Sequence, residues 1–514
     1  MRFYSFPGDR VVRNLILSCA TALLVLTACT KTSEVRTPAQ WQHMARTDLD
    51  AAHALILAAH PGAIDVQNPG FRAAAQAAYS EAQASIARVD NYDSALSAVR
   101  IYVTSFQDGH LSYSDERRPR TATVPFAGWR IAYRDGKFLV AATVADWPAP
   151  QPAPGAQLLA CDGKPALALF EQQVAPFNNG RAQAIESDAA DLAFAWFSDL
   201  KYKQCRFLEG GKEVDYRVAY QEWRYHDVEN YFSHVPRQAP AARENGYWLR
   251  DGTLWIRAAN FNLQEGTPQA AELEKMRKEL AHIRGVQRIV FDARGNGGGD
   301  SRIGGMLFDA ATGGLDTGMT DAELAKLPHT FAQWRVSPFS IEHTSKYIEH
   351  AVALFGKDSA QAADARRFAD ELRAAGAAGQ AWVTQPGGPR VSALDVARHH
   401  GKLRAYPDGV TVALITDAAC ASACLDFADT VRMVPGARHL GRTTSADTVY
   451  IDVGWTNLPS GNKLILPLKV WRNRLRGNNQ PWVPDTVLKV EMNDDAAVEA
   501  ATIGALSASA WAGG

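Results

Sequence analysis

One stretch, residues 410–429, constrains the fold of this chain more than any other. Residues 410–416 (V-T-V-A-L-I-T) are mostly apolar and β-branched, which predicts a buried strand. Residues 417–421 are small and turn-like, and apolar side chains then recur at helical spacing. Ser422 is therefore expected where a buried strand passes into a helix, beside backbone N–H groups that favour negative charge.

A serine in this position has two interpretations. It can be an ordinary helix N-cap, whose hydroxyl accepts a hydrogen bond from the first turn. It can also be a nucleophile, because nucleophilic serines of α/β hydrolases stand at the same kind of strand-to-helix turn. The stretch alone favours the N-cap, and the rest of the chain has to decide between the two.

Size and composition narrow the class of protein. The chain has 514 residues, which predicts two or three domains. Hydrophobic residues make up 46% and charged residues 21%, as in soluble globular proteins. The formal net charge is −1 and there is no block of basic residues, which argues against nucleic acid as a partner.

The N-terminus indicates export. Arg2, Arg10 and Arg13 precede an apolar run at residues 15–28 that is too short to span a bilayer and is typical of a secretory signal. The run ends in L-T-A-C, which resembles a bacterial lipoprotein cleavage box. That resemblance implies a signal peptide at 1–28 and a lipid on Cys29; an ordinary signal peptide or a retained anchor are the alternatives. We expect a periplasm-facing protein held to the membrane by its lipid, with the outer membrane favoured.

Three further regions are predicted. Residues 29–120 form a tether and a small helical domain that closes in Asp-Gly-His at 108–110. Residues 121–225 carry short alternating strands, among them 158–161 followed by a tight turn at Asp162-Gly163. The stretch 153–165 resembles part of a PDZ domain, with Ala156 in place of the usual Asp. Residues 240–500 form an α/β domain.

Inside the α/β domain, the pattern over 246–312 is strand, strand, helix, strand. We expect strands at 252–258 and 286–291, a helix at 268–283 with Leu273, Met276 and Leu280 on one face, and a second helix from Asp300 or Ser301. Residues of about 320–400 are predicted as a mostly helical insertion, either a lid or a plain solvent-facing helical pair. A β-rich tail runs to Asp485.

Four features stand in order: Asp-Gly-His at 108–110, the PDZ-like segment, Arg-Gly-Asn-Gly-Gly-Gly at 294–299 and Ala-Ser-Ala at 421–423. This order resembles the carboxyl-terminal processing, or tail-specific, serine peptidases and the related tricorn core, and V-P-D at 483–485 continues it. The chain departs from the family pattern at Leu111, at 419–420 and at Leu425. The resemblance implies an α/β fold with a core of stacked ββα units (ClpP/crotonase-like), a PDZ-like β domain and an N-terminal helical domain.

The resemblance also implies roles for single residues. Ser422 corresponds to the nucleophile. Residues 444–448 lack the lysine that serves as the base in some members. His110 is therefore the expected base, because histidine side chains in general have a pKa near working pH. The third member is Asn478 by alignment, with Asp447 as a competitor. Oxyanion donors are expected from the backbone of Gly297, Gly298 and Ala423, since glycines let N–H groups approach a substrate closely.

The cysteines beside Ser422 allow two interpretations. Cys420 and Cys424 are either small core residues or a local disulfide that fixes the turn, because the mature protein should face an oxidising space. Cys161 and Cys205 are the other two cysteines downstream of the lipid site.

The sequence therefore predicts a lipid-anchored serine peptidase that acts on extended polypeptides, possibly near carboxyl termini, and needs no metal or cofactor. A peptide-binding protein on the same scaffold is one rival, favoured by the missing lysine and by Leu425. A small-molecule esterase or amidase is the other. The oligomeric state is not predictable from the sequence.

Overall fold

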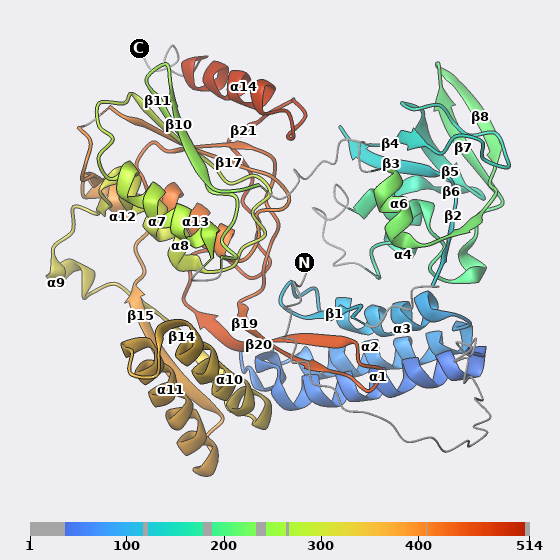
Figure 1. Cartoon of the computed structure of the whole chain (residues 1–514), viewed down its shortest axis with the longest axis horizontal. Helices are drawn as coiled ribbons and strands as arrows, with labels where there is room; N and C mark the ends of the chain where they lie inside the picture. The colour runs from blue at the N-terminus through green and yellow to red at the C-terminus, as the bar shows by residue number, and fades with distance from the viewer. Residues whose placement is uncertain are drawn as a thin grey trace, which may run out of the picture. The chain divides into compact units, whose positions relative to one another are not determined.

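The structure is a computed structural model, and it describes residues 36–116, 122–177, 188–232, 243–263, 267–407 and 409–508. Cys29 and the expected signal peptide lie outside these residues. No helix among the described residues combines the length and apolar character that crossing a bilayer requires. Residues from Thr37 onward form one compact unit, and its elements are shown in Figure 1.

The N-terminal part is helical, as predicted. Its three long helices are α1 (Pro38–Ala59), α2 (Phe71–Ser85) and α3 (Tyr92–Thr104). Thr37 caps α1 and Asn91 caps α3, each in a reciprocal capping box that satisfies two backbone donors. The apolar positions expected to face inward on α1, among them Leu49, Ala52 and Ile56, are completely buried.

A β-rich part follows. Its main sheet contains β3 (Trp129–Arg134), β4 (Lys137–Thr143), β5 (Gln157–Cys161), β7 (Gln204–Glu209) and β8 (Lys212–Arg217) in that order, with β6 (Lys164–Pro165) beside β5. Helix α4 (Ala166–Gln173) contacts β5, and β2 (Val124–Phe126) pairs with β9 (Gln221–Trp223) just before α6 (Tyr225–Tyr231). The predicted strand and turn around Asp162 are present, since Cys161 pairs with Lys164 across it. The assignment of this part as PDZ-like stays a prediction.

The α/β part is built on a six-stranded sheet. Its order is β10 (Gly246–Arg250), β11 (Thr253–Arg257), β12 (Arg288–Asp292), β17 (Thr411–Thr416), β18 (Arg438–Gly441) and β21 (Thr486–Val487), all parallel after the first pair. Helices α7 (Pro268–Leu280), α8 (Ser301–Thr312) and α13 (Ala423–Arg432) cover one face, and α14 (Asp495–Ala508) covers the other (Figure 1). Leu273, Met276 and Leu280 are the buried residues of α7, as expected.

Residues 320–400 contain the predicted helices and, in addition, two strands of a second sheet. Between α9 (Asp321–Leu324) and α12 (Ala393–Arg398), the helices α10 (Pro338–Phe355) and α11 (Ala360–Ala377) are flanked by strands β14 (His329–Arg335) and β15 (Trp382–Pro389). These strands join β19 (Tyr450–Asn457) and β20 (Lys463–Arg472) of the tail. The two strands therefore belong to a shared sheet, because β14 pairs with β15 on one side and, on the other, with β20, about 140 residues further along the chain.

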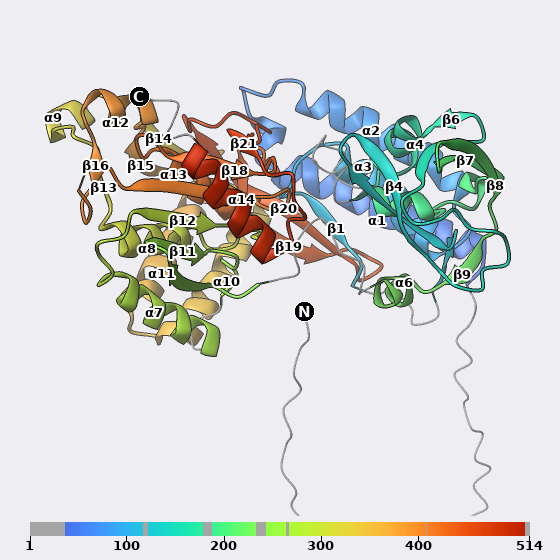
Figure 2. The same cartoon turned by 90° about the horizontal axis from the view of Figure 1, so that it is seen from above.

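The same sheet connects the helical part to the α/β part. Strand β1 (Ser112–Ser114), which follows the Asp-Gly-His motif, pairs antiparallel with β20, so that Ser112 lies opposite Ile465 (Figure 2). Because β1 begins just after His110 in the chain, this pairing brings His110 close to the α/β part.

Candidate active site

Ser422 stands between β17 and α13, where the sequence places it. Its backbone has φ 53° and ψ −120°, a conformation that costs energy for a residue with a Cβ and that is typical of functional turns. Its hydroxyl makes no capping hydrogen bond to the helix. The N-cap interpretation is therefore wrong.

His110 provides the partner of the Ser422 hydroxyl. Its Nε2 lies 3.1 Å from Ser422 Oγ, across 312 positions of sequence. Such a separation lets a serine hydroxyl donate to an unprotonated imidazole nitrogen. The structure thus brings together the two residues that the sequence analysis singled out.

Asp108 and His60 lie behind His110. The His60 Nδ1 accepts a hydrogen bond from the Gly62 N–H, so its Nε2 carries the proton and donates to Asp108 Oδ2 at 3.3 Å. Asp108 Oδ1 accepts from the His110 N–H at 2.9 Å and lies 4.0 Å from His110 Nδ1. Burial acts to raise the pKa of Asp108, but the hydrogen bond from His60, together with His110, outweighs burial and lowers it. A buried negative charge therefore faces the far side of the His110 ring.

Neither Asp108 nor His60 was predicted as a site residue from the sequence. The signal for Asp108 was present, because it belongs to the Asp-Gly-His motif. No local pattern marked His60, which belongs to the first helical region and reaches Asp108 only through the packing of helices.

The glycine loop at 295–299 lies against the nucleophile turn. A Cβ on Gly298 would come within 2.8 Å of the Ser422 Cβ and 2.7 Å of the Ala421 carbonyl oxygen, and its φ is +98°. Only glycine fits there. The Ala421 N–H also donates to the Asn296 carbonyl oxygen at 3.2 Å. Loop and turn are therefore built as one unit.

Asp417 holds the glycine loop and the nucleophile turn together through hydrogen bonds. Its carboxylate accepts hydrogen bonds from the N–H groups of Gly295 and Ala419. Burial raises the pKa of Asp417 to about 6, although these hydrogen bonds act in the opposite direction.

The backbone donors expected for an oxyanion differ in their availability. The Gly298 N–H donates to the Asn296 side-chain oxygen at 2.9 Å. The N–H groups of Gly297 and Ala423 have no acceptor within the part of the chain that the structure describes. Of the three predicted donors, these two remain available to a ligand.

The side chains of Asn478 and Asp447 make their hydrogen bonds and ion pairs with residues other than His110. The Asn478 side-chain oxygen accepts from the Val449 N–H at 2.9 Å, and the Asp447 carboxylate pairs with Arg474 at 3.0 Å and with Arg476. Neither has a bond to His110 among the described residues. Their connection to the site runs through Asn479, whose N–H donates to the Asp447 carbonyl and whose Nδ2 donates to the Gln107 carbonyl, both at 2.8 Å.

The described residues contain two disulfides. Cys420 and Cys424 are bonded across the Ser422 turn, with their Cα atoms 5.3 Å apart, and Cys161 is bonded to Cys205 in the β-rich part. The proposed local pair is therefore confirmed. Within the described ranges, no group of three or more His, Cys, Asp or Glu side chains is arranged to hold a metal ion.

Comparison with solved structures identifies the fold. Mature CPAF matches over 91% of this chain and 98% of its own, with a TM-score of 0.55 and 12% sequence identity. This chain has the CPAF fold. The structure of mature CPAF complexed with lactacystin gives the same TM-score and identity, and a mutant of CPAF gives a TM-score of 0.53 over 90% of this chain. No family model and no curated protein matches the sequence. The predicted fold class is confirmed.

Proposed function

We propose that the protein is a serine peptidase that cleaves extended or loosely folded polypeptides through an acyl-enzyme. The observation that carries this proposal is the Ser422–His110 pair at 3.1 Å, formed at a strained strand-to-helix turn. Weak nucleophiles such as serine need an adjacent base, and a base oriented by a third group completes the arrangement.

The proposed reaction uses groups already in place. His110 Nε2 takes the Ser422 proton as Oγ attacks the scissile carbonyl, and the carbonyl oxygen becomes negative. The N–H groups of Ala423 and Gly297 donate to that oxygen. His110 then gives its proton to the leaving amine, and a water molecule, deprotonated by the same nitrogen, hydrolyses the acyl-enzyme and restores Ser422.

We assign the orienting role to Asp108. Its charge favours the proton on His110 Nδ1, which leaves Nε2 free to accept, and it stabilises the imidazolium formed during the reaction. The distance of 4.0 Å between Asp108 Oδ1 and His110 Nδ1 is long for a direct hydrogen bond. Catalytic hydrogen bonds in ligand-free sites are often long and tighten when substrate binds.

The fluorophosphonate reaction tests this function. A serine-directed fluorophosphonate probe should label the protein, and peptide mapping should place the label on Ser422. Because such probes require an activated hydroxyl, failure to label would favour the rival function, a binding protein on the same scaffold. A label on another serine would contradict the assignment of Ser422.

The disulfide should matter more for rate than for stability. Cys420→Ala with Cys424→Ala should lower the peptidase rate by about tenfold to a hundredfold, since small displacements at a reacting centre are costly. Its loop is so short that the bond should add at most about 2 kcal/mol to the free energy of unfolding.

Cys161→Ala with Cys205→Ala is the matched control. This bond closes a longer loop, with a sequence separation of 44, in the β-rich part. Its loss should lower the melting temperature more than the rate. Rate assays and thermal melts of both pairs decide the matter: a Cys420/Cys424 variant with the parent's rate would remove the positioning role.

The membrane anchor remains part of the proposal. L-T-A-C at 26–29 suggests a lipid on Cys29, and Thr30 rather than Asp follows it, which favours the outer membrane. Growth with a palmitate analogue should label the protein, and Cys29→Ser should abolish the label. An unlabelled parent protein would remove this claim.

A further inference from the structure

The residues that follow the proposed base in the chain line a cavity of about 470 Å³. Leu111 and Ser112, the two residues after His110, line it. Asp115, which also lines the cavity, is five residues from His110, which is at most about 18 Å in an extended chain. A polypeptide held at Ser422 could therefore reach this cavity with a residue only a few positions from the scissile bond.

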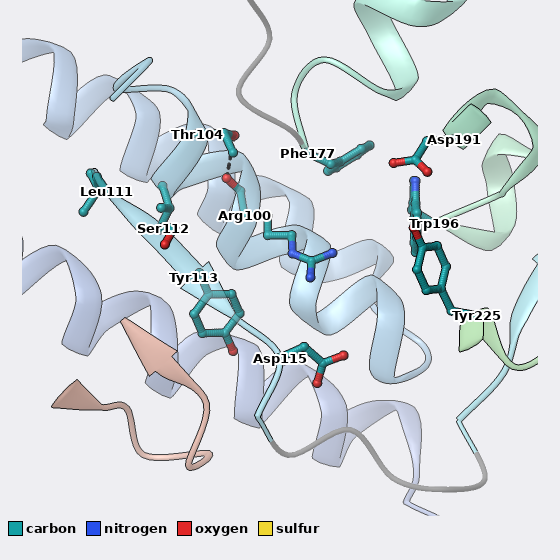
Figure 3. A pocket seen from close by; sticks show the side chains of 11 residues that line it. Arg100, Thr104, Leu111, Ser112, Tyr113, Asp115, Phe177, Asp191, Trp196 and Tyr225 are labelled. Carbon is teal, nitrogen blue, oxygen red and sulfur yellow. Dashed lines mark hydrogen bonds between the residues drawn. The ribbon is translucent and has the colours of Figure 1, made fainter. Parts of the chain in front are cut away.

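Two parts of the molecule form its walls. Helix α3 and β1 form one wall, and residues of the β-rich part, among them Trp196 and Tyr225, form the other (Figure 3). Thr104 Oγ1 connects the walls, because it lies 2.7 Å from the Arg100 carbonyl and 2.6 Å from the Pro176 carbonyl. The Ser198 hydroxyl adds a second connection by donating to Asp90 at 2.7 Å. The cavity is thus braced by hydrogen bonds.

Arg100 presents its charge to this space. Its guanidinium extends from α3 toward the wall that carries Trp196 and Tyr225 (Figure 3). Within the described ranges, Arg100 has no side-chain hydrogen bond and no ion pair. A guanidinium carries five donors, and a carboxylate is the protein group that matches its planar fork.

The opposite wall adds donors. Trp196 is only 6% exposed, and its indole Nε1–H is buried without an acceptor among the residues that the structure describes. Such orphaned donors are rare in folded proteins and call for an explanation. The charge of Asp191 and burial raise the pKa of Tyr225, while Arg100 lowers it, so the phenol keeps its proton and can donate. Phe177 completes an aromatic surface around these donors.

Two carboxylates also line the cavity, and they limit what can bind. Asp115 accepts a hydrogen bond from the Tyr92 hydroxyl at 2.5 Å. The charge of Asp191 raises the pKa of Tyr225. Their charges oppose an anion everywhere except near the guanidinium and would attract a cation. A cationic occupant is therefore the competing outcome that an experiment must separate.

We propose that this cavity is a specificity pocket that takes a carboxylate of the substrate polypeptide, held by Arg100 and the Trp196 Nε1–H. The proposal rests on the peptidase function proposed above. The carboxylate can come from a Glu or Asp side chain or from the chain terminus. The remainder of the substrate residue packs on the aromatic wall.

A randomised, N-acetylated peptide library provides the test, prepared once with amidated and once with free carboxyl termini. Cleavage by the parent protein should enrich Glu and Asp at one fixed distance from the scissile bond, by roughly tenfold over Gln and Asn, because charge-assisted hydrogen bonds are the strong ones. Cleavage at a fixed distance from the terminus, only in the free-carboxylate library, would assign the terminal carboxylate instead. Both results support the proposal.

Substitutions of Arg100 test whether this residue binds the carboxylate. Arg100→Ala should remove the enrichment, Arg100→Lys should keep part of it, and Arg100→Glu should shift it toward Lys and Arg. Arg367→Ala, an exposed arginine on α11, is the matched control and should keep the parent's pattern. An unchanged pattern in Arg100→Ala, or enrichment of Lys and Arg by the parent, would overturn the proposal.

Fluorophosphonate labelling separates this failure from failure of the proposed function. All Arg100 variants should label at Ser422 at the parent's rate, since the pocket lies beyond the reacting atoms. A parent that neither labels nor cleaves would overturn both proposals together. Labelling and cleavage without any carboxylate preference would overturn only the pocket.

Discussion

Ser422→Ala should lower peptide hydrolysis by roughly 10⁴-fold or more, because no other group in the turn can supply the attacking oxygen. The free energy of unfolding should change little, since the hydroxyl has His110 as its hydrogen-bond partner and does not cap α13. Ser422→Gly should be equally inactive but more stable than the parent, by about 1 kcal/mol, because glycine adopts φ 53° without strain.

The measurement is the rate on a fluorogenic peptide, together with thermal unfolding of each variant. Ser80→Ala, which removes an exposed hydroxyl on α2, is the control and should behave as the parent. Residual activity of Ser422→Ala within about tenfold of the parent would mean that another residue is the nucleophile.

The nucleophile turn could be predicted because its signals are local. Residues 411–416 are apolar enough to be buried in any fold, and the helical spacing begins at once behind a short turn of small residues. The two cysteines that form the disulfide lie in the same short stretch, whereas the strained backbone of Ser422 is visible only in the structure. Patterns of this kind can be recognised without knowledge of the tertiary structure.

Strand β15 shows where local patterns fail. Its sequence, W-V-T-Q-P-G-G-P, contains two prolines and two glycines, which disfavour a strand. The segment becomes a strand because it lies at the edge of its sheet, where β14 alone supplies its partners. Edge strands tolerate proline, and only the tertiary structure reveals which segment is at an edge.

The surroundings of His110 depend even more on distant residues. Arg476 is buried and binds Asp429 on α13, the helix that Ser422 precedes, and Asp447. Asp447 accepts from Asn479, which in turn holds the Gln107 carbonyl just before the Asp-Gly-His motif. In the structure, the segment that the alignment proposed as catalytic connects the nucleophile helix to the loop that carries His110. No sequence pattern distinguishes these two roles.

His110→Ala should be nearly as damaging as Ser422→Ala, because a serine hydroxyl without its base is a poor nucleophile. The double variant should be no slower than either single variant, since the two residues act as one unit. Asp108→Asn should retain more activity than His110→Ala while still losing most of the rate, because the amide keeps the shape and loses the charge. His282→Ala, an exposed histidine after α7, is the control.

Lysine is the alternative base, and the structure places the nearest candidates elsewhere. Lys463 pairs with Glu116 at 3.0 Å, Lys469 pairs with Asp452 at 2.8 Å, and Lys489 is exposed. Alanine variants of these three should therefore keep the parent's turnover. An active His110→Ala beside an inactive lysine variant would transfer the base to that lysine. A double variant at least ten times slower than Ser422→Ala would show instead that His110 contributes independently of the serine.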